Sequence, residues 1–361
     1  MDSNRTADIL QVSPTQTQNA RLVILIPSFN EWTALELLFQ RLDTVCFPAG
    51  WQASVLVIDD ASTQPLPAGW PGSVAGAVKT LEILHLRCNL GHQRAIAIGL
   101  YHIHEQLDAD AVIVMDGDGE DRVEDLPALL AEFERGHRRD AVFAARGKRM
   151  ESLGFQAGYQ AYRLLHRILT GIEVRVGNFS VLPREAVTRL MPVSDLWNHY
   201  AAAVLRARLP RRLLPLARGS RLAGKSKMNF VSLLTHGLNA ISVFSDQVSA
   251  RLLASTAVFS LVTGLAVAAS LIGWQVAPQS MPGWLPMVLG TMAVLAAQTL
   301  TFATIFVFTV SNRRSASGFM LQRDSPYFIL GTTRVRGQNG LENLGRALTS
   351  IDRTRTVGVK G

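Results

Sequence analysis

Residues 21–31 read RLVILIPSFNE, a nearly unbroken apolar run that ends abruptly in polar residues. Further short apolar runs follow at 55–58, 81–86, 111–115 and 141–145. Strands that helices bury on both faces have this composition. The stretches between them, at 31–45, 92–107 and 126–135, look helical. This alternation predicts an α/β domain with a mostly parallel, helix-covered sheet over residues 21–229, after a flexible polar tail at 1–20.

Polar residues follow each of the first four apolar runs. They are Pro27-Ser28-Phe29-Asn30-Glu31, then Asp59-Asp60-Ala61-Ser62, then Asn89-Leu90-Gly91, and last Asp116-Gly117-Asp118-Gly119-Glu120-Asp121. In a parallel sheet the carboxyl ends of the strands meet along one edge, and ligands bind there. We therefore expect these four segments to form one binding site.

The last of these segments is the sharpest chemical signal in the sequence. Asp116 and Asp118 stand two residues apart at a strand end, so their carboxylates can bind one hard cation. Mg²⁺ is usually held by one or two carboxylates together with substrate phosphates, and Mn²⁺ takes the same oxygen ligands. A calcium loop does not fit, because Asp121 stands where that loop needs glycine and Pro127 where it needs glutamate. A plain charged turn is the alternative for this segment taken alone.

The chain is 48% hydrophobic and only 18% charged, which is apolar for a purely soluble protein, and two long segments, 252–274 and 284–310, carry no charged residue. About 20 apolar residues suffice for a helix to cross a bilayer, so two transmembrane helices are expected; buried core helices are the alternative. Basic residues before the first segment and after the second, Arg251, Arg313 and Arg314, place both ends in the cytoplasm. The first 20 residues hold no apolar signal core. We therefore expect a protein of the inner membrane with a cytoplasmic head.

The segments that flank these spans are basic or amphipathic. Residues 230–251 predict an amphipathic helix that lies in the membrane interface or packs on the head. Residues 206–227 include many Arg and Lys and no acid, which suits lipid headgroups or phosphorylated ligands. The same run has no aromatic residue to stack bases, so no nucleic-acid partner is expected. Residues 311–361 are expected to form a basic cytosolic tail. Gly264 and Ala268 form a small-residue pair that would suit a homo-oligomer.

The four polar segments, in this order, resemble glycosyltransferases of family 2, which have the GT-A fold. The later stretch RLAGKSKM at 221–228, followed by two apolar segments, is similar to the polyprenyl-phosphate glycosyltransferase branch of that family, which includes dolichol-phosphate mannose synthase. The resemblance covers residues 21–310. It implies an inverting, Mg²⁺- or Mn²⁺-dependent transferase that moves a sugar from a UDP- or GDP-sugar to polyprenyl phosphate at the cytosolic membrane face.

The resemblance also implies roles for individual residues. The nucleoside pocket would be lined by Pro27, Phe29 and Glu31; base or ribose would be bound by Asp59 or Asp60; and the nucleotide would lie against Asn89 and Gly91. The metal would be held by Asp116 and Asp118, with Glu120 as a third ligand. Phosphates of the donor or the lipid would be held by Arg146, Arg149, Arg221, Lys225 and Lys227, since guanidinium groups match phosphate oxygens. The reacting centre would involve Asp116, Asp118, Arg146 and Arg149.

The chain departs from the family pattern in two places. Relatives often have glutamine where Glu120 stands, and many carry Gly-Asp-Phe-Arg where this chain has Gly177-Asn178-Phe179-Ser180. The missing acid could have served as a general base, which a hydroxyl acceptor needs and an anionic lipid phosphate does not. His199 is the remaining candidate base, although a structural role is favoured for it.

Other functions were weighed against this one. A membrane-bound family 2 transferase with a different lipid or glycan acceptor is the main alternative, and a non-catalytic membrane scaffold is a third. A nicotinamide-dependent oxidoreductase is excluded, because no Gly-x-Gly-x-x-Gly follows the first apolar run. The two cysteines, Cys46 and Cys88, are isolated and predict neither a metal site nor a disulfide.

Overall fold

The computed structural model describes residues 19–71, 76, 78–146, 160, 164–171, 176–224, 230–276, 279, 282–315 and 319–336. In chain order, the elements up to residue 146 are β1 (Ala20–Ser28), α1 (Trp32–Leu42), β2 (Trp51–Asp59), β3 (Val78–Leu86), α2 (His92–Gln106), β4 (Ala111–Val114), η1 (Val123–Asp125), α3 (Leu126–Arg135) and β5 (Ala141–Arg146). There follow β6 (Val176–Pro183), α5 (Arg184–Leu190), η2 (Ser194–Trp197), α6 (Tyr200–Arg206), β7 (Arg211–Leu216), α7 (Phe230–Ser242), α8 (Ser245–Val276), α9 (Leu285–Ser315), α10 (Leu321–Asp324), η4 (Ser325–Phe328) and β8 (Ile329–Arg336).

Within these described residues, eight strands form one mixed sheet in the order β7-β5-β6-β4-β1-β2-β3-β8. β1 pairs in parallel with β2 and with β4, and β2 pairs in parallel with β3. The carboxyl ends of these four strands therefore meet at one edge. β6 runs antiparallel between β4 and β5. The predicted α/β domain with a mostly parallel sheet is confirmed, and the strands predicted at the five apolar runs are β1 to β5.

Both faces of the sheet are covered by helices, which explains why its central strands, β1 and β4, are mostly apolar. Leu22, Ile24 and Ile26 of β1 pack with α1 and α3, whereas Val23 and Leu25 pack with α2, α5 and α6. Each of these side chains is at most 4% exposed. Burying one such aliphatic side chain stabilises the fold by about 1.5–3 kcal/mol. The two cores fix the sheet edge at which the polar loops lie.

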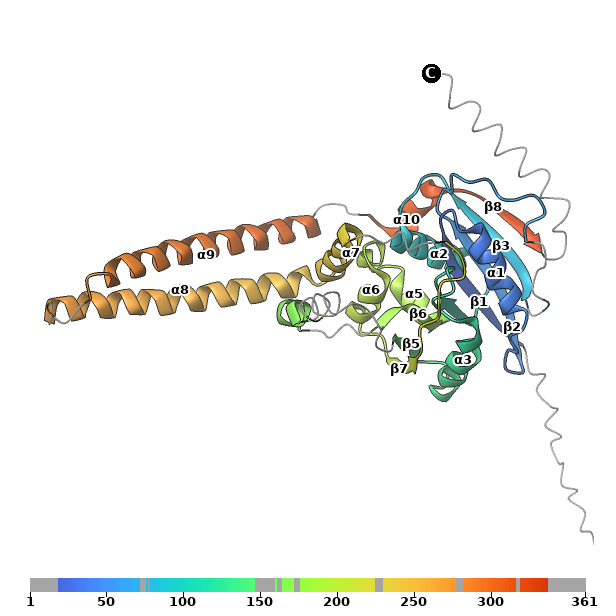
Figure 1. The fold of residues 1–361 in the computed structure, drawn as a ribbon, viewed down its shortest axis with the longest axis horizontal. Helices are drawn as coiled ribbons and strands as arrows, with labels where there is room; N and C mark the ends of the chain where they lie inside the picture. The colour runs from blue at the N-terminus through green and yellow to red at the C-terminus, as the bar shows by residue number, and fades with distance from the viewer. Residues whose placement is uncertain are drawn as a thin grey trace, which may run out of the picture.

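Helices α8 and α9 extend away from the head as a long hairpin (Figure 1). They pack against each other, and the Ser260 hydroxyl lies 3.5 Å from the carbonyl oxygen of Ala296. Both helices are long and apolar enough to span a membrane. Large apolar side chains such as Leu261, Leu265 and Phe302 are exposed along them. The expected spans at 252–274 and 284–310 lie along these two helices.

The helix expected at 230–251 is divided in the structure into α7 and the start of α8. At the break, Val243 and Phe244 are both buried, together with Ala202 and Leu205 of α6. This end of the segment therefore packs on the head, which was one of the two expected arrangements.

The segment after the hairpin returns to the head, which differs from the tail expected at 311–361. β8 pairs antiparallel with β3 and becomes the edge strand of the sheet (Figure 1). Ahead of β8, Phe319 and Phe328 pack on Trp197, with ring centroids 3.8 and 5.4 Å apart. The hairpin brings the chain back to the head, where β3 offers an unpaired edge. The last residues of the expected tail, 337–361, lie outside the described part of the chain.

Candidate functional site

The loops after β1 and β2 are joined by hydrogen bonds. Asn30, whose φ of 54° is left-handed, donates from its backbone N–H to Ser62 Oγ at 2.9 Å. Its side-chain oxygen accepts from the N–H of Gln64 at 2.9 Å. These bonds hold the half-buried side chains of Phe29 and Glu31 at the rim of the sheet edge. The structure thus brings together the first two of the four predicted segments.

Asp59 ends β2 and is nearly buried. Its Oδ1 accepts from the N–H of Ser62 at 2.9 Å, and its Oδ2 lies 3.0 Å from Nδ1 of His85. Burial raises the pKa of Asp59, but the hydrogen bonds with His85 and Ser62 outweigh it, so the pKa falls below the ordinary value of 3.8. Asp59 is therefore ionised at neutral pH and orders the loop that follows β2.

Asp60 shapes the third segment. Its two carboxylate oxygens accept the backbone N–H groups of Leu90 at 2.7 Å and Gly91 at 2.8 Å. Burial raises the pKa of Asp60 above its ordinary value, although these two hydrogen bonds oppose the rise. Gly91 adopts a φ of +88°, which glycine accommodates readily. The turn that carries the exposed Asn89 is thereby tied to the end of β2.

Residues 116–121, called the acidic segment below, fold back on themselves after β4. The N–H of Asp116 donates to Oδ2 of Asp121, and the N–H of Glu120 donates to Oδ1 of Asp118, both at 2.9 Å. Asp118, Glu120 and Asp121 are buried. Oδ1 of Asp116 lies 3.1 Å from Nε2 of His92, the first residue of α2. The segment thus presents several carboxylates within a few residues at the strand end.

Part of the basic run at 206–227, namely residues 218–222, lies directly against this acidic segment. Arg221 pairs with Asp118 through N–O atoms 2.7 Å apart, and it lies 3.4 Å from Oε1 of Glu31. Arg218 pairs with Glu120. The backbone joins as well, because the N–H of Leu222 donates to the carbonyl of Asp118 at 2.8 Å. The structure therefore neutralises the acidic segment with arginines that follow it by about a hundred residues in the chain.

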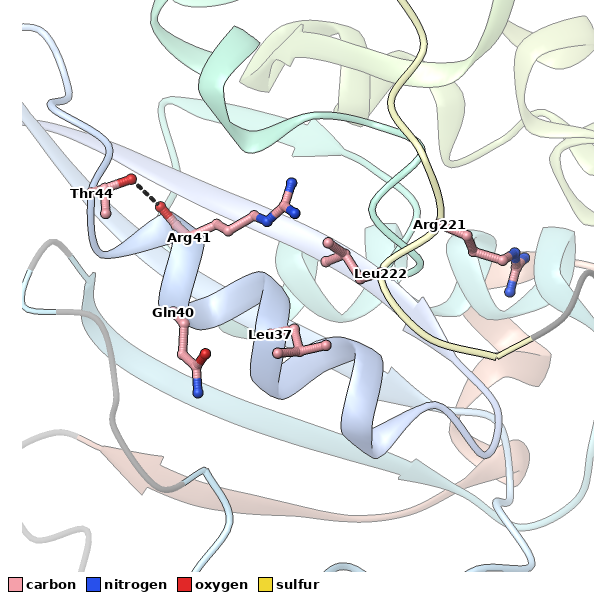
Figure 2. A pocket seen from close by; sticks show the side chains of 6 residues that line it. All are labelled: Leu37, Gln40, Arg41, Thr44, Arg221 and Leu222. Carbon is pink, nitrogen blue, oxygen red and sulfur yellow. Dashed lines mark hydrogen bonds between the residues drawn. The ribbon is translucent and has the colours of Figure 1, made fainter.

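A hollow of about 320 Å³ adjoins this contact. It is lined by Leu37, Gln40, Arg41, Thr44, Arg221 and Leu222. Figure 2 shows Leu222 extending toward α1 while Arg221 extends to the other side of the same segment.

The carboxylates suit a hard cation only in combination with oxygen atoms from a ligand. Among the described residues, no group of three or more His, Cys, Asp or Glu is arranged to hold a metal ion. Asp116 and Asp118 supply the oxygen donors that Mg²⁺ and Mn²⁺ prefer, and such ions commonly complete their shell with phosphate and water. Glu120 instead faces Arg218. Its role as a third ligand stays a prediction.

Some predicted phosphate-binding residues cannot be placed. Arg149, Lys225 and Lys227 lie outside the described residues. Only the backbone of Arg146 is described, at the end of β5, where it pairs with Leu216 of β7. Arg221 is the one of the five whose side chain is described, and it lies at the acidic segment.

Asn178 lies beside His92 and next to the acidic segment. Its Nδ2 is 2.9 Å from Nε2 of His92, and its Oδ1 accepts from Gln93 at 3.3 Å. His199 is buried and caps α6, since its Nδ1 accepts from the N–H of Ala202 at 3.3 Å. This contact favours the structural role over that of a base.

Two residues of the site were not predicted from the sequence. His92 directly follows the Asn89-Leu90-Gly91 segment, so its place at a strand-to-helix turn was the available signal. Arg218 lies within the basic run, but nothing local distinguishes it from the other basic residues there.

Comparison with known proteins agrees with this geometry. Residues 23–195 match the model of the glycosyl transferase family 2. The undecaprenyl-phosphate 4-deoxy-4-formamido-L-arabinose transferases of Klebsiella pneumoniae (strain 342) and Salmonella typhimurium are each 26% identical over 219 residues. Each match covers 59% of this chain and 64% of the relative, so the chain spans less than two thirds of the length of these relatives.

Likeness to solved structures is loose. A mannosyltransferase from Pyrobaculum calidifontis, in complex with GDP-Man and Mn²⁺, is 15% identical with a TM-score of 0.40, and the match covers 86% of this chain and 91% of that one. A glucosyl-3-phosphoglycerate synthase from Mycobacterium tuberculosis is 14% identical with a TM-score of 0.47, over 63% and 80% of the two chains. The resemblance to the glycosyl transferase family 2 therefore rests on the sequence match at residues 23–195.

Proposed function

We propose that this protein is an inverting, metal-dependent glycosyltransferase that moves a sugar from a UDP- or GDP-sugar to polyprenyl phosphate. The observation that carries the proposal is the Asp116–Asp118 pair, which lies under Arg221 at the edge where four parallel strands end. The head that holds this site resembles a family 2 domain and continues into two helices that could span a membrane. A lipid phosphate as the acceptor is supported by relatives that are named undecaprenyl-phosphate 4-deoxy-4-formamido-L-arabinose transferases.

Asp116 and Asp118 would hold Mg²⁺ or Mn²⁺, which neutralises the charge that grows on a departing nucleoside diphosphate. Arg221 now forms its short ion pair with Asp118. With a cation bound to that carboxylate, the guanidinium of Arg221 would be available to hold a phosphate oxygen of the donor or the lipid, a group that arginine can bind in a bidentate way. The rim formed by Phe29, Glu31 and the loop after Asp59 would hold the nucleoside.

The chemistry requires no general base. A lipid phosphate oxygen attacks C1 of the sugar, and the bond from C1 to the diphosphate oxygen breaks with inversion. The leaving group keeps the bonding electrons, and no proton has to be removed from the acceptor. Asn178 fits this scheme, because its amide cannot take up a proton. An acceptor hydroxyl would instead need a base near this position.

The junction of head and hairpin suits the surface of a bilayer. The helical residues Leu164, Leu165 and Ile168 are 61%, 50% and 61% exposed, whereas His166 of the same turn is buried against Phe244. An exposed apolar patch beside candidate spans marks a membrane contact. Together with the positive charge that flanks the spans, this supports a cytoplasmic head docked on the inner membrane.

The test uses the full-length protein in nanodiscs, radiolabelled UDP- and GDP-sugars, undecaprenyl phosphate, and Mn²⁺ or Mg²⁺. We expect a lipid-linked monosaccharide that disappears with EDTA and in Asp116→Asn and Asp118→Asn. Glu105→Gln is the control, because it removes a carboxylate at the opposite end of α2 from His92. Full turnover in the two aspartate variants would refute the assigned site. Labelling of a different lipid or a glycan, with none of polyprenyl phosphate, would establish the alternative acceptor.

A further inference from the structure

Three polar side chains form a row across the last three strands of the sheet. Thr333 on the return strand β8 is 3% exposed, and its Oγ1 lies 3.1 Å from Nε2 of His85 on β3. Nδ1 of the same imidazole lies 3.0 Å from Oδ2 of Asp59 on β2. β2, β3 and β8 are neighbours in the sheet. The row therefore connects the segment that returns from the hairpin to the end of a strand at the candidate site.

The positions of the protons in this row follow from what each group can donate. Asp59 has a lowered pKa and is ionised, so it only accepts, and Nδ1 of His85 must carry the proton between them. The other ring nitrogen, Nε2, lies within hydrogen-bond distance of the Thr333 hydroxyl, which can donate to it or accept from it. Thr333 thus holds the imidazole in the orientation in which His85 donates to Asp59.

Asp59 is connected by hydrogen bonds to the loop that carries Phe29 and Glu31 at the rim of the site. Its other oxygen accepts from the N–H of Ser62, whose hydroxyl in turn accepts from the N–H of Asn30. Asn30 stands between Phe29 and Glu31, so a turn of the Asp59 carboxylate would displace both loops at once. A change at Thr333 can therefore reach the nucleoside side of the site without touching it.

We infer that Thr333 is a positioning residue for nucleotide binding, acting through His85 and Asp59. The inference rests on the proposed function, because it assigns the nucleoside to this rim. Thr333 lies outside residues 23–195, the part of the chain that matches the family model. The return segment, residues 319–336, thus acts on the binding site through His85 and does more than close the edge of the sheet.

Thr333→Val tests the inference, because it removes the hydroxyl and keeps the shape and the strand propensity of threonine. Affinity for UDP or GDP with Mn²⁺ would be measured by calorimetry on the full-length protein in nanodiscs. Losing one such hydrogen bond is expected to weaken nucleotide binding about three- to tenfold. Thr333→Ser keeps the hydroxyl and should bind within about twofold of the wild type. Thr332→Val makes the same change at the neighbouring, exposed position of β8 and should have no effect.

A double variant shows whether Thr333 acts through His85. In a His85→Ala background, Thr333→Val should cause no further loss, because coupled residues are not additive. Wild-type affinity in Thr333→Val refutes the inference, as does a failure of Thr333→Ser to recover binding or an equal loss in Thr332→Val. If Thr333→Val also lowers the unfolding temperature, the serine variant still separates the hydroxyl from the fold. Absence of any nucleotide binding by the wild type would refute the proposed function itself, which is a different result.

Discussion

Gly119 is the point at which the arginine-bearing segment rests on the acidic segment. It adopts a φ of +87°, and a Cβ placed there would lie against Leu222, 2.8 Å from its Cδ1. Gly119→Ala therefore adds two costs, one from the left-handed backbone and one from the contact. Gly50 is a matched control, because its φ is +86° and no atom lies within 4 Å of its added Cβ.

The magnitudes separate the two costs. A left-handed backbone disfavours alanine by about 1–2 kcal/mol, which both variants should lose from the free energy of unfolding. Crowding in a packed contact costs about 1–3 kcal/mol, which only Gly119→Ala should lose. Leu222 is only partly buried, so the segment can relieve part of the crowding by moving away. Arg221 would then leave Asp118, and metal-dependent nucleotide binding should change in Gly119→Ala alone.

The assay is urea unfolding of the purified protein in detergent, followed by tryptophan fluorescence and paired with nucleotide titration in Mn²⁺. Adding Leu222→Ala to Gly119→Ala should recover the crowding cost, because the contact is then absent. The reasoning is refuted if Gly119→Ala destabilises no more than Gly50→Ala does, or if Leu222→Ala recovers nothing.

Three further predictions concern the surroundings of the site. Asp59 has a lowered pKa, so its contribution to the free energy of unfolding is full above about pH 4 and is lost as the pH falls through the folded-state pKa. Below about pH 4, the free energy of unfolding of Asp59→Asn should therefore depend less steeply on pH than that of the wild type. Equal slopes would contradict this. Trp197→Ala removes the ring on which Phe319 and Phe328 pack, and should weaken the attachment of residues 319–336 to the head by about 1–3 kcal/mol. Trypsin should then cleave faster at Arg334, and an unchanged cleavage rate would count against attachment through these rings. Arg206, one-third exposed, pairs with Asp195 and Asp246 at 3.2 and 3.0 Å, so Arg206→Ala should lower stability by about 1–2 kcal/mol by chemical unfolding, more than Ala at the exposed Arg211 does.

Much of the fold was predictable from short windows of sequence. The run at 21–26 and its successors specify buried strands because nearly every residue in them is apolar, and that pattern needs no distant partner to be recognised. The uncharged segments at 252–274 and 284–310 predict long apolar helices for the same reason. The order of polar residues after each run was enough to place Asp59, Asp60, Gly91 and Asp116 at one edge.

The contacts that complete the site were decided by the tertiary structure. Arg218 and Arg221 meet Glu120 and Asp118 only because β7 and the segment after it return past the end of β4, and an ion pair has no local sequence pattern that would reveal its partner. Thr333 reaches His85 only because the hairpin carries the chain back to the open edge of β3. Local hydrophobic pattern acts within a few residues and determines the elements, whereas pairing between strands far apart in the chain depends on how the whole sheet closes.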